Sequence, residues 1–371
     1  MTVQTTDESV IEKWLNERHP FAIYRMPDET CCHGVRQLTN TLTRLEHISE
    51  LNHHKGFIFV PFHPGKEHSL WIISPEEEVS FTPVLPEENI PPAPIPVPFC
   101  GTPEPQPSAA YAACFAKCID ALKRHEFDKL VLSRYQTIEI PSGFSLASAF
   151  RAACRRYIHS YVYLLYTPEN GFWLGATPEI LLSGQQGHYK TVALAGTQAL
   201  DNGQLSEPWS EKNVHEQQYV TDYIVNCLQK QDIHPHLKGP FTVTAGSLAH
   251  LKTELTFTLP PHAESISHLL QSLHPTPAVC GLPKDKAYRF LRENEQYDRG
   301  YYSGFLGYLD AEGQTDLYVN LRCMQITDSH IRCFAGGGLL SSSILEDEWT
   351  ETEKKLQTMK YVIQKGTAHV L

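Results

Sequence analysis

Two glutamates lie on helix-like segments at positions where a carboxylate could bind a cation. Glu216 lies one turn before Val220 on the apolar stripe of SEKNVHEQQYVTDYIVNCL (210–228), and a charge that faces a core is costly unless it is paired or binds a metal. Glu351 lies at the margin of an apolar stripe in EDEWTETEKKLQTMKYVI, four residues before Lys355. Each glutamate has an ordinary alternative: a solvent-exposed helix end for Glu216, and a surface ion pair with Lys355 for Glu351.

A lysine and a third glutamate could transfer protons. Lys129 opens the predicted strand KLVLSRYQTIEI (129–140), and Glu179 closes the stretch GATPE just after the predicted strand 172–176. A lysine beside a cation or in a dry pocket keeps enough neutral amine to act as a base, whereas a lysine at a strand edge simply reaches water. A carboxyl at a strand end can act as an acid, or it can cap a turn at a loop tip. The residues alone leave these alternatives open.

Further features could bind an anionic group. The glycines of AGGG (335–338) could bring backbone N–H groups close to a carboxylate, or they could form a flexible turn after the strand HIRCF. Their spacing is not that of a nucleotide-binding loop. Arg322 and Arg299 could each bind a carboxylate with two hydrogen bonds, or form a salt bridge within the protein. Together with the residues above, they describe a site for a small anionic substrate, with a hard divalent cation on carboxylates.

The elements that must position these residues are helices and short strands without strict alternation. We expect helices at 109–125, 146–156, 210–228, 265–273, 285–294 and 346–364. We expect strands at 56–62, 69–74, 129–140, 161–166, 172–176, 189–194, 241–243, 255–259, 304–309, 317–326 and 330–334. Runs of adjacent strands interrupted by helices favour an α+β fold with largely antiparallel sheets.

A proline-rich stretch, NIPPAPIPVPFCGTPEPQPS (89–108), divides the chain. Proline at nearly every second position prevents a helix or a central strand there. This pattern favours a stiff connector over a ligand for a proline-recognition domain. We therefore expect an N-terminal region, 1–105, that contributes strands, and a domain over 106–371 that carries all the candidate residues.

Composition narrows the class of protein and its partners. The chain has 371 residues, 41% hydrophobic and 20% charged, with a net charge of -11 and no basic tract, so nucleic acid and anionic membrane surfaces are not expected partners. It has no apolar run of membrane-spanning length and no signal pattern at its start, which predicts a cytoplasmic protein. The 10 cysteines form no CxxC array and the 19 histidines are dispersed. We therefore expect reduced thiols and no zinc site.

The motifs, taken in order, resemble those of the chorismate-utilising enzymes and, within them, the isochorismate synthases. From about Ala109 to the C-terminus the chain contains KLVLSR, GATPEILL, ALAGT, SEKNVHEQQYV, HPTPAVCGLP, YDRGYYSGFLG, LRC, FAGGG and EWTETEKKL. The resemblance implies an α+β fold in which two antiparallel sheets pack together, with flanking helices and one active site between the sheets. It implies an isomerase that converts chorismate reversibly to isochorismate, by attack of water at C2 and loss of the C4 hydroxyl.

The resemblance also assigns the chemical roles. Glu216 and Glu351 match the family's Mg²⁺ ligands. Lys129 matches the base that activates water, and Glu179 matches the acid that protonates the departing hydroxyl. Other residues match groups that bind the substrate carboxylates, namely Arg322, Gly336 and Lys355. Two more, Thr197 and His250, resemble the wall of the substrate pocket.

Related activities differ at a few residues. Ala195 stands where aminodeoxychorismate synthases carry a nucleophilic lysine. Anthranilate synthases generally lack the lysine found here as Lys129 and carry a tryptophan-sensing N-terminal motif that this chain lacks, so no glutaminase subunit is expected. Salicylate synthases share Lys129 and Glu179 and are the alternative activity, and an inactive chorismate-binding homologue is the alternative without chemistry. Menaquinone and siderophore biosynthesis both start from isochorismate and are not separated by these residues. We expect a monomer, since no long exposed apolar pattern demands a partner.

Overall fold

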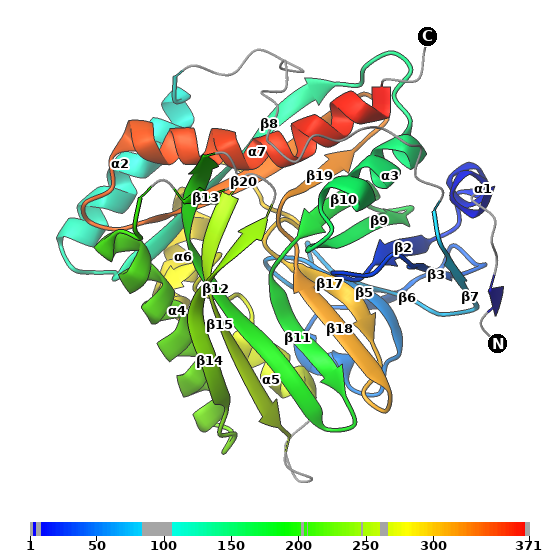
Figure 1. Cartoon of the computed structure of the whole chain (residues 1–371), viewed down its shortest axis with the longest axis horizontal. Helices are drawn as coiled ribbons and strands as arrows, with labels where there is room; N and C mark the ends of the chain where they lie inside the picture. The colour runs from blue at the N-terminus through cyan, green and yellow to red at the C-terminus, as the bar shows by residue number, and fades with distance from the viewer. Residues whose placement is uncertain are drawn as a thin grey trace.

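The computed structural model of the chain describes residues 3–4, 9–83, 106–201, 204–205, 207–245, 248–259 and 266–367. Most of the proline-rich stretch, residues 89–105, lies outside this description, and so does the expected boundary at residue 105. The described residues form two ten-stranded sheets with helices on their outer faces (Figure 1). This arrangement confirms the expected α+β architecture of packed, largely antiparallel sheets.

In the first sheet, the strand that begins with Lys129, the predicted base, lies next to one edge. Its strands lie in the order β1 (Val3–Gln4), β7 (Glu77–Phe81), β3 (Cys32–Arg36), β2 (Phe21–Arg25), β9 (Tyr161–Thr167), β10 (Gly171–Thr177), β19 (Cys323–Ile326), β20 (His330–Leu339), β8 (Lys129–Glu139) and β16 (Gly281–Leu282). Apart from β1 with β7, neighbouring strands are antiparallel.

The second sheet is antiparallel. Its strands lie in the order β14 (His236–Ala245), β15 (Leu248–Thr258), β12 (His188–Asp201), β11 (Ile180–Gln185), β18 (Gln314–Val319), β17 (Phe305–Leu309), β5 (Gly56–Val60), β6 (Leu70–Ile73) and β4 (Thr43–Leu45), and β13 (Gln204–Leu205) pairs with β12. Strands from the first hundred residues enter both sheets, because β2 pairs with β9 and β5 pairs with β17. The N-terminal strands are therefore part of the same framework as the predicted site.

Helices cover the outer faces of the sheets. They are α1 (Ser9–Glu17), α2 (Ala109–Lys123), α3 (Leu146–Arg156), α4 (Glu211–Gln229), α5 (Ile266–Leu273), α6 (Lys284–Asn294) and α7 (Leu345–Thr367), with a short 3₁₀ helix at Ile48–Leu51. In Figure 1, α7 runs across β20 and β8, while α4 lies along the second sheet. All six predicted helices are present, within three residues at each end. Among the helices of the described residues, none is both long and apolar enough to span a membrane.

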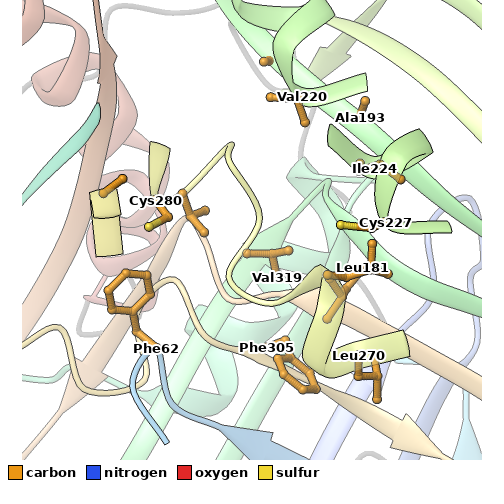
Figure 2. Close-up of a cluster of buried hydrophobic side chains, with 14 of the residues drawn as sticks. Phe62, Leu181, Ala193, Val220, Ile224, Cys227, Leu270, Cys280, Phe305 and Val319 are labelled. Atoms are coloured by element: carbon orange, nitrogen blue, oxygen red, sulfur yellow. The ribbon is translucent and has the colours of Figure 1, made fainter. Parts of the chain in front are cut away.

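The apolar stripe of α4 is buried, as its spacing predicts. Val220, Ile224 and Cys227 point toward Ala193 of β12 and Leu181 of β11 (Figure 2). Burial of such side chains stabilises a fold by roughly 1.5–3 kcal/mol each. The stripe fixes the rotation of α4 against the second sheet, so Glu216, one turn earlier, is held near the gap between the sheets.

Several expectations about strands need correction. The predicted strand 317–326 is two strands in different sheets, because β18 ends at Val319 and β19 begins at Cys323. The chain crosses between the sheets at Arg322, whose φ of 47° is left-handed. The AGGG segment is not a turn: it continues β20, with Gly336 opposite Ser133. The strands predicted at 189–194, 241–243 and 255–259 are longer in the structure, where they belong to β12, β14 and β15 in that order. These three strands pair with one another along their length, and their exposed polar residues conceal the alternation of apolar and polar side chains.

The sequence predicts reduced cysteines and no zinc site. All nine described cysteines are free. No group of three or more His, Cys, Asp or Glu side chains in the described ranges is arranged to hold a metal ion as the side chains stand.

Candidate active site

A pocket lies between the two sheets, with about 670 Å³ of empty space that is partly open to solvent. Seven of the nine predicted site residues line it: Glu179, Thr197, Glu216, His250, Arg322, Gly336 and Lys355. The other two, Lys129 and Glu351, lie behind this wall, each in contact with a lining residue. The structure therefore brings together residues from eight separate segments of the chain.

Lys129 and Glu216 form a pair at the back of the pocket. Lys129 is fully buried at the start of β8, and its Nζ lies 2.9 Å from Glu216 Oε1, at ion-pair distance but poorly aligned for a hydrogen bond. Burial acts to raise the pKa of the Glu216 carboxyl, but the nearby lysines, Lys129 first, outweigh burial and lower it. The Glu216 side chain is 13% exposed. Glu216 is thus an ionised group facing the pocket, not a solvent-exposed helix end.

Glu179 is enclosed between β10 and β11 and only 3% exposed. Thr276 Oγ1 donates a hydrogen bond to Glu179 Oε1 at 3.3 Å. Burial raises the pKa of Glu179 to about 7, against the hydrogen bond from Thr276 and the positive charges of nearby side chains. The carboxyl can therefore hold or release a proton near neutral pH. Its burial rules out the alternative of a capping acid at a loop tip, and Thr276 is a contact that the sequence analysis did not identify.

His250 and Arg322 form a buried pair on the pocket wall. Arg322 Nη2 lies 3.2 Å from His250 Nε2, and His250 Nδ1 lies 3.1 Å from Gly196 O and 3.3 Å from Thr197 Oγ1. Because a guanidinium only donates, Nε2 accepts and the ring proton sits on Nδ1. Burial, followed by the charges of Arg322 and Lys355, lowers the pKa of His250 to about 3. A neutral His250 thus orients a cationic Arg322.

Lys355 reaches the pocket from α7 and contacts β20. Its Nζ donates to Gly336 O at 2.8 Å and lies 2.7 Å from Glu351 Oε1. The predicted ion pair between Glu351 and Lys355 is therefore present. It is not an ordinary surface pair, because both side chains are partly buried beside the pocket.

Glu348 is a further acidic residue of the site that the sequence analysis missed. It is 1% exposed, and its Oε1 accepts from Lys212 Nζ at 2.7 Å and from Ser343 Oγ at 2.6 Å. Burial and the charge of Glu351 raise its pKa. Within the described residues, its Oε2 is buried without a hydrogen-bond partner. The signal was available: Glu348 precedes Glu351 by three residues, a spacing that places both on one helix face.

Three carboxylates lie beside adjacent glycines of β20, and their oxygens are of the kind that binds a divalent cation. A Cβ at Gly337 would lie 3.3 Å from Glu348 Oε2 and 3.9 Å from Glu351 Oε1. A Cβ at Gly338 would overlap Glu216 Oε1. Carboxylate oxygens are the ligands that Mg²⁺ prefers, and the unpartnered Oε2 adds a donor. In the structure each of these three carboxylates is paired with a lysine. A bound cation would therefore have to displace those lysines.

Arg299 serves the framework and not the pocket. Its Nη2 lies 2.6 Å from Glu295 Oε1 and donates to Val131 O at 2.6 Å, and its Nη1 donates to Val279 O at 2.7 Å. The structural alternative for Arg299 is therefore confirmed. The ion pair of Arg299 with Glu295 supports two segments that line the pocket, because Arg299 binds Val131 and Val279 and both of these residues face the cavity.

Comparison with known proteins agrees with this geometry. Residues 87–364 match the protein family described as chorismate binding enzyme. The isochorismate synthase EntC of Escherichia coli K12 is 31% identical over 245 residues, 63% of this chain and 62% of EntC. The vibriobactin-specific isochorismate synthase of Vibrio cholerae is 28% identical over 240 residues, 62% of this chain and 60% of the relative. The matched segment thus spans less than two thirds of these relatives.

A solved structure extends the likeness in fold to nearly the whole chain. The menaquinone-specific isochorismate synthase MenF of Escherichia coli superposes with a TM-score of 0.76 and 22% identity, over 94% of this chain and 89% of MenF. At this identity the likeness concerns the fold, including the N-terminal strands.

Proposed function

Since this chain belongs to the chorismate-binding enzyme family, we propose that it is an isochorismate synthase, converting chorismate reversibly to isochorismate with Mg²⁺. The observation that carries the proposal is Glu179, a buried carboxyl whose pKa is raised by burial to about 7, in a pocket that also holds Arg322 and Lys355. An acid that can be protonated at neutral pH beside cationic groups suits the departure of a hydroxyl from a dianionic substrate.

The two proton transfers would fall to Lys129 and Glu179. Lys129 would accept a proton from the attacking water as its oxygen bonds to C2. The two conjugated double bonds of the ring would each shift by one position, the C4–O bond would break, and the departing hydroxyl would take the proton of Glu179. One water enters and one leaves, so the composition of the substrate is unchanged. Side chains of suitable chemistry for both transfers are present at or directly behind the pocket wall.

The substrate carboxylates would bind to cationic and backbone groups of the wall. Arg322 is held by His250, and Lys355 is held by Gly336 O, so both approach the pocket in fixed positions. Fixed donors bind an anion with little reorganisation. Thr197 and His250 would form the wall beside the ring.

Mg²⁺, when bound, would neutralise and polarise a substrate carboxylate. Glu216 and Glu351 would hold the ion, with Glu348 beside them. The support is chemical: these are oxygen donors, Glu348 Oε2 is buried without a partner among the described residues, and the glycines of β20 leave space in front of it.

The test is the product formed from chorismate. The purified chain is incubated with chorismate, with and without Mg²⁺, and the products are separated by chromatography. Isochorismate alone, formed only with Mg²⁺, supports the proposal. Salicylate with pyruvate would make the chain a salicylate synthase, and no consumption would make it a binding protein. A Lys129→Ala protein with full activity would remove Lys129 from the mechanism.

A further inference from the structure

The strand that carries Lys129 carries a second cationic side chain on its opposite face. Successive side chains of a strand alternate between faces, so Lys129 and Arg134 in β8 point to opposite sides of the first sheet. Lys129 faces Glu216 and the pocket. Arg134 is buried against α7, the helix that covers the other side. Arg134 ends the motif KLVLSR and has no part in the proposed reaction.

Arg134 contacts α7 in three different ways. Its guanidinium carbon lies 3.6 Å from the centre of the Trp349 ring. Its Nε donates to Thr352 Oγ1 at 2.8 Å, and its Nη2 donates to Glu353 Oε1. A planar guanidinium can stack and form directed hydrogen bonds at once, which a lysine cannot do. Arg134 therefore fixes both the position and the rotation of this part of α7.

The contacts of Arg134 and the candidate site occupy the same turns of α7. Trp349, Thr352 and Glu353 are three and four residues apart and share one stripe of the helix. The adjacent stripe of the same turns carries Glu348, Glu351 and Lys355. A rotation of the helix that breaks the contacts of Arg134 must also move the carboxylates away from the glycines of β20.

Neighbouring contacts support the same arrangement. Glu353 also binds Lys360 Nζ at 3.2 Å through its second oxygen. Tyr111 of α2 packs edge-on against Trp349, with ring centres 5.2 Å apart. The Glu353 carboxylate thus bridges β8 and the next turns of α7, and the helix is held from two sides.

We propose that Arg134 is a positioning residue for the cation site: it holds the first half of α7 over β20 and thereby places Glu348 and Glu351 for a divalent cation. The part that concerns the cation rests on the proposed function. Residues that orient metal ligands typically change metal affinity about 10- to 100-fold when they are replaced. Arg134→Met keeps the length and the apolar contact of the side chain but removes the directed hydrogen bonds.

Arg36 offers a matched control within the chain. It is a buried arginine of β3, lies 5.2 Å from the centre of the Trp14 ring, and pairs with the carboxylates of Glu17 and Glu77. Its contacts have the same chemistry as those of Arg134 but belong to another part of the first sheet. Arg36→Met therefore reports the general loss of stability caused by removing a buried arginine.

The experiment compares both variants with the unaltered full chain by two measurements. Hydrogen exchange reports opening of the segment 345–355 in the absence of metal. Electron paramagnetic resonance of free Mn²⁺, an ion that also prefers oxygen ligands, reports cation affinity with and without chorismate. For Arg134→Met we expect faster exchange in 345–355 and about tenfold weaker Mn²⁺ binding. For Arg36→Met we expect neither change.

Several outcomes decide the inference. Equal exchange in 345–355 for Arg134→Met and Arg36→Met would overturn it, and so would unchanged Mn²⁺ affinity in Arg134→Met. If the unaltered chain binds no Mn²⁺, the cation assignment of the proposed function fails, and the exchange data alone decide whether Arg134 holds α7. If Arg134→Met does not fold, Glu353→Gln and Glu77→Gln form a milder pair with the same expected contrast.

Discussion

Lys129 Nζ and Glu216 Oε1 lie 2.9 Å apart, and Gly338 passes beside both side chains. A Cβ on Gly338 would overlap Glu216 Oε1 and lie 2.9 Å from Lys129 Cε. Because Gly338 has no side chain, Lys129 of β8 and Glu216 of α4 can approach each other. The glycine serves the geometry of the pair and not a turn, because it lies within β20 opposite Val131.

The first prediction concerns Gly338→Ala. The new methyl group meets the far ends of two flexible side chains, which can move aside at small cost to the fold. We expect the melting temperature to change little, whereas chorismate turnover falls roughly 10- to 100-fold because the pair is displaced. Turnover and thermal unfolding are measured on the same preparation.

Gly65→Ala is the control for that prediction. A Cβ there meets no atom within 4 Å, and Gly65 lies in a loop of the N-terminal region. It should leave both turnover and melting temperature unchanged. If Gly338→Ala keeps full turnover, the position of the Lys129–Glu216 pair has no role in the reaction.

Much of the site could be predicted from the sequence because its residues belong to regular elements. Helical spacing places Glu216 on the buried side of α4, and the structure confirms this through Val220 and Ile224. The position of Lys129 at the start of β8 and of Glu179 just after β10 is also confirmed. Local patterns of this kind are set within a few residues, so the sequence carries them.

The missed contacts depend on distant segments. Thr276 reaches Glu179 from a loop almost a hundred residues further along the chain. The glycines of AGGG continue β20 because β8 pairs with them, and neither strand reveals that pairing by itself. Glu348 looks like one more acid of an acidic first turn; its spacing places it on one helix face with Glu351, but its contact with Lys212 of the distant α4 could not be predicted from that spacing.

The second prediction concerns Glu348→Gln. Glutamine keeps the size of the side chain but removes its charge and weakens its affinity for Mg²⁺. We expect the Mg²⁺ concentration that gives half-maximal turnover to rise about 10- to 100-fold. Glu346→Gln, an exposed acid in the same first turn, is the control and should leave it unchanged. The same Mg²⁺ dependence in both variants would remove Glu348 from the cation site.

The third prediction concerns the proton on His250. Burial and neighbouring cations lower the pKa of His250 to about 3, and Arg322 directs the ring proton to Nδ1. We expect the ¹⁵N spectrum of this imidazole to remain that of the neutral Nδ1–H form from pH 8 to about pH 4. The signal is assigned by its loss in His250→Gln. An imidazolium at pH 6 would mean that Arg322 is not held as described.

The fourth prediction concerns the stability of the fold. The pKa of Glu179 is about 7 in the folded chain against 4.5 for an unperturbed carboxyl. Between these values the folded chain keeps a proton that the unfolded chain has lost, so stability falls as pH rises from 4.5 to 7. The difference corresponds to about 3 kcal/mol. Urea unfolding should show that Glu179→Gln loses less stability over this window than the unaltered chain does.

The fifth prediction concerns the pH dependence of turnover, and it separates an acid from a merely buried carboxyl. An acid must carry its proton, so with a pKa of about 7 for Glu179 turnover should fall as pH rises above 7, approaching tenfold for each pH unit. Glu179→Gln should lower turnover about 100- to 10,000-fold. The small remaining activity should no longer fall above pH 7. If Glu179→Gln shows the same fall in turnover above pH 7, the proton that controls this fall belongs to another group.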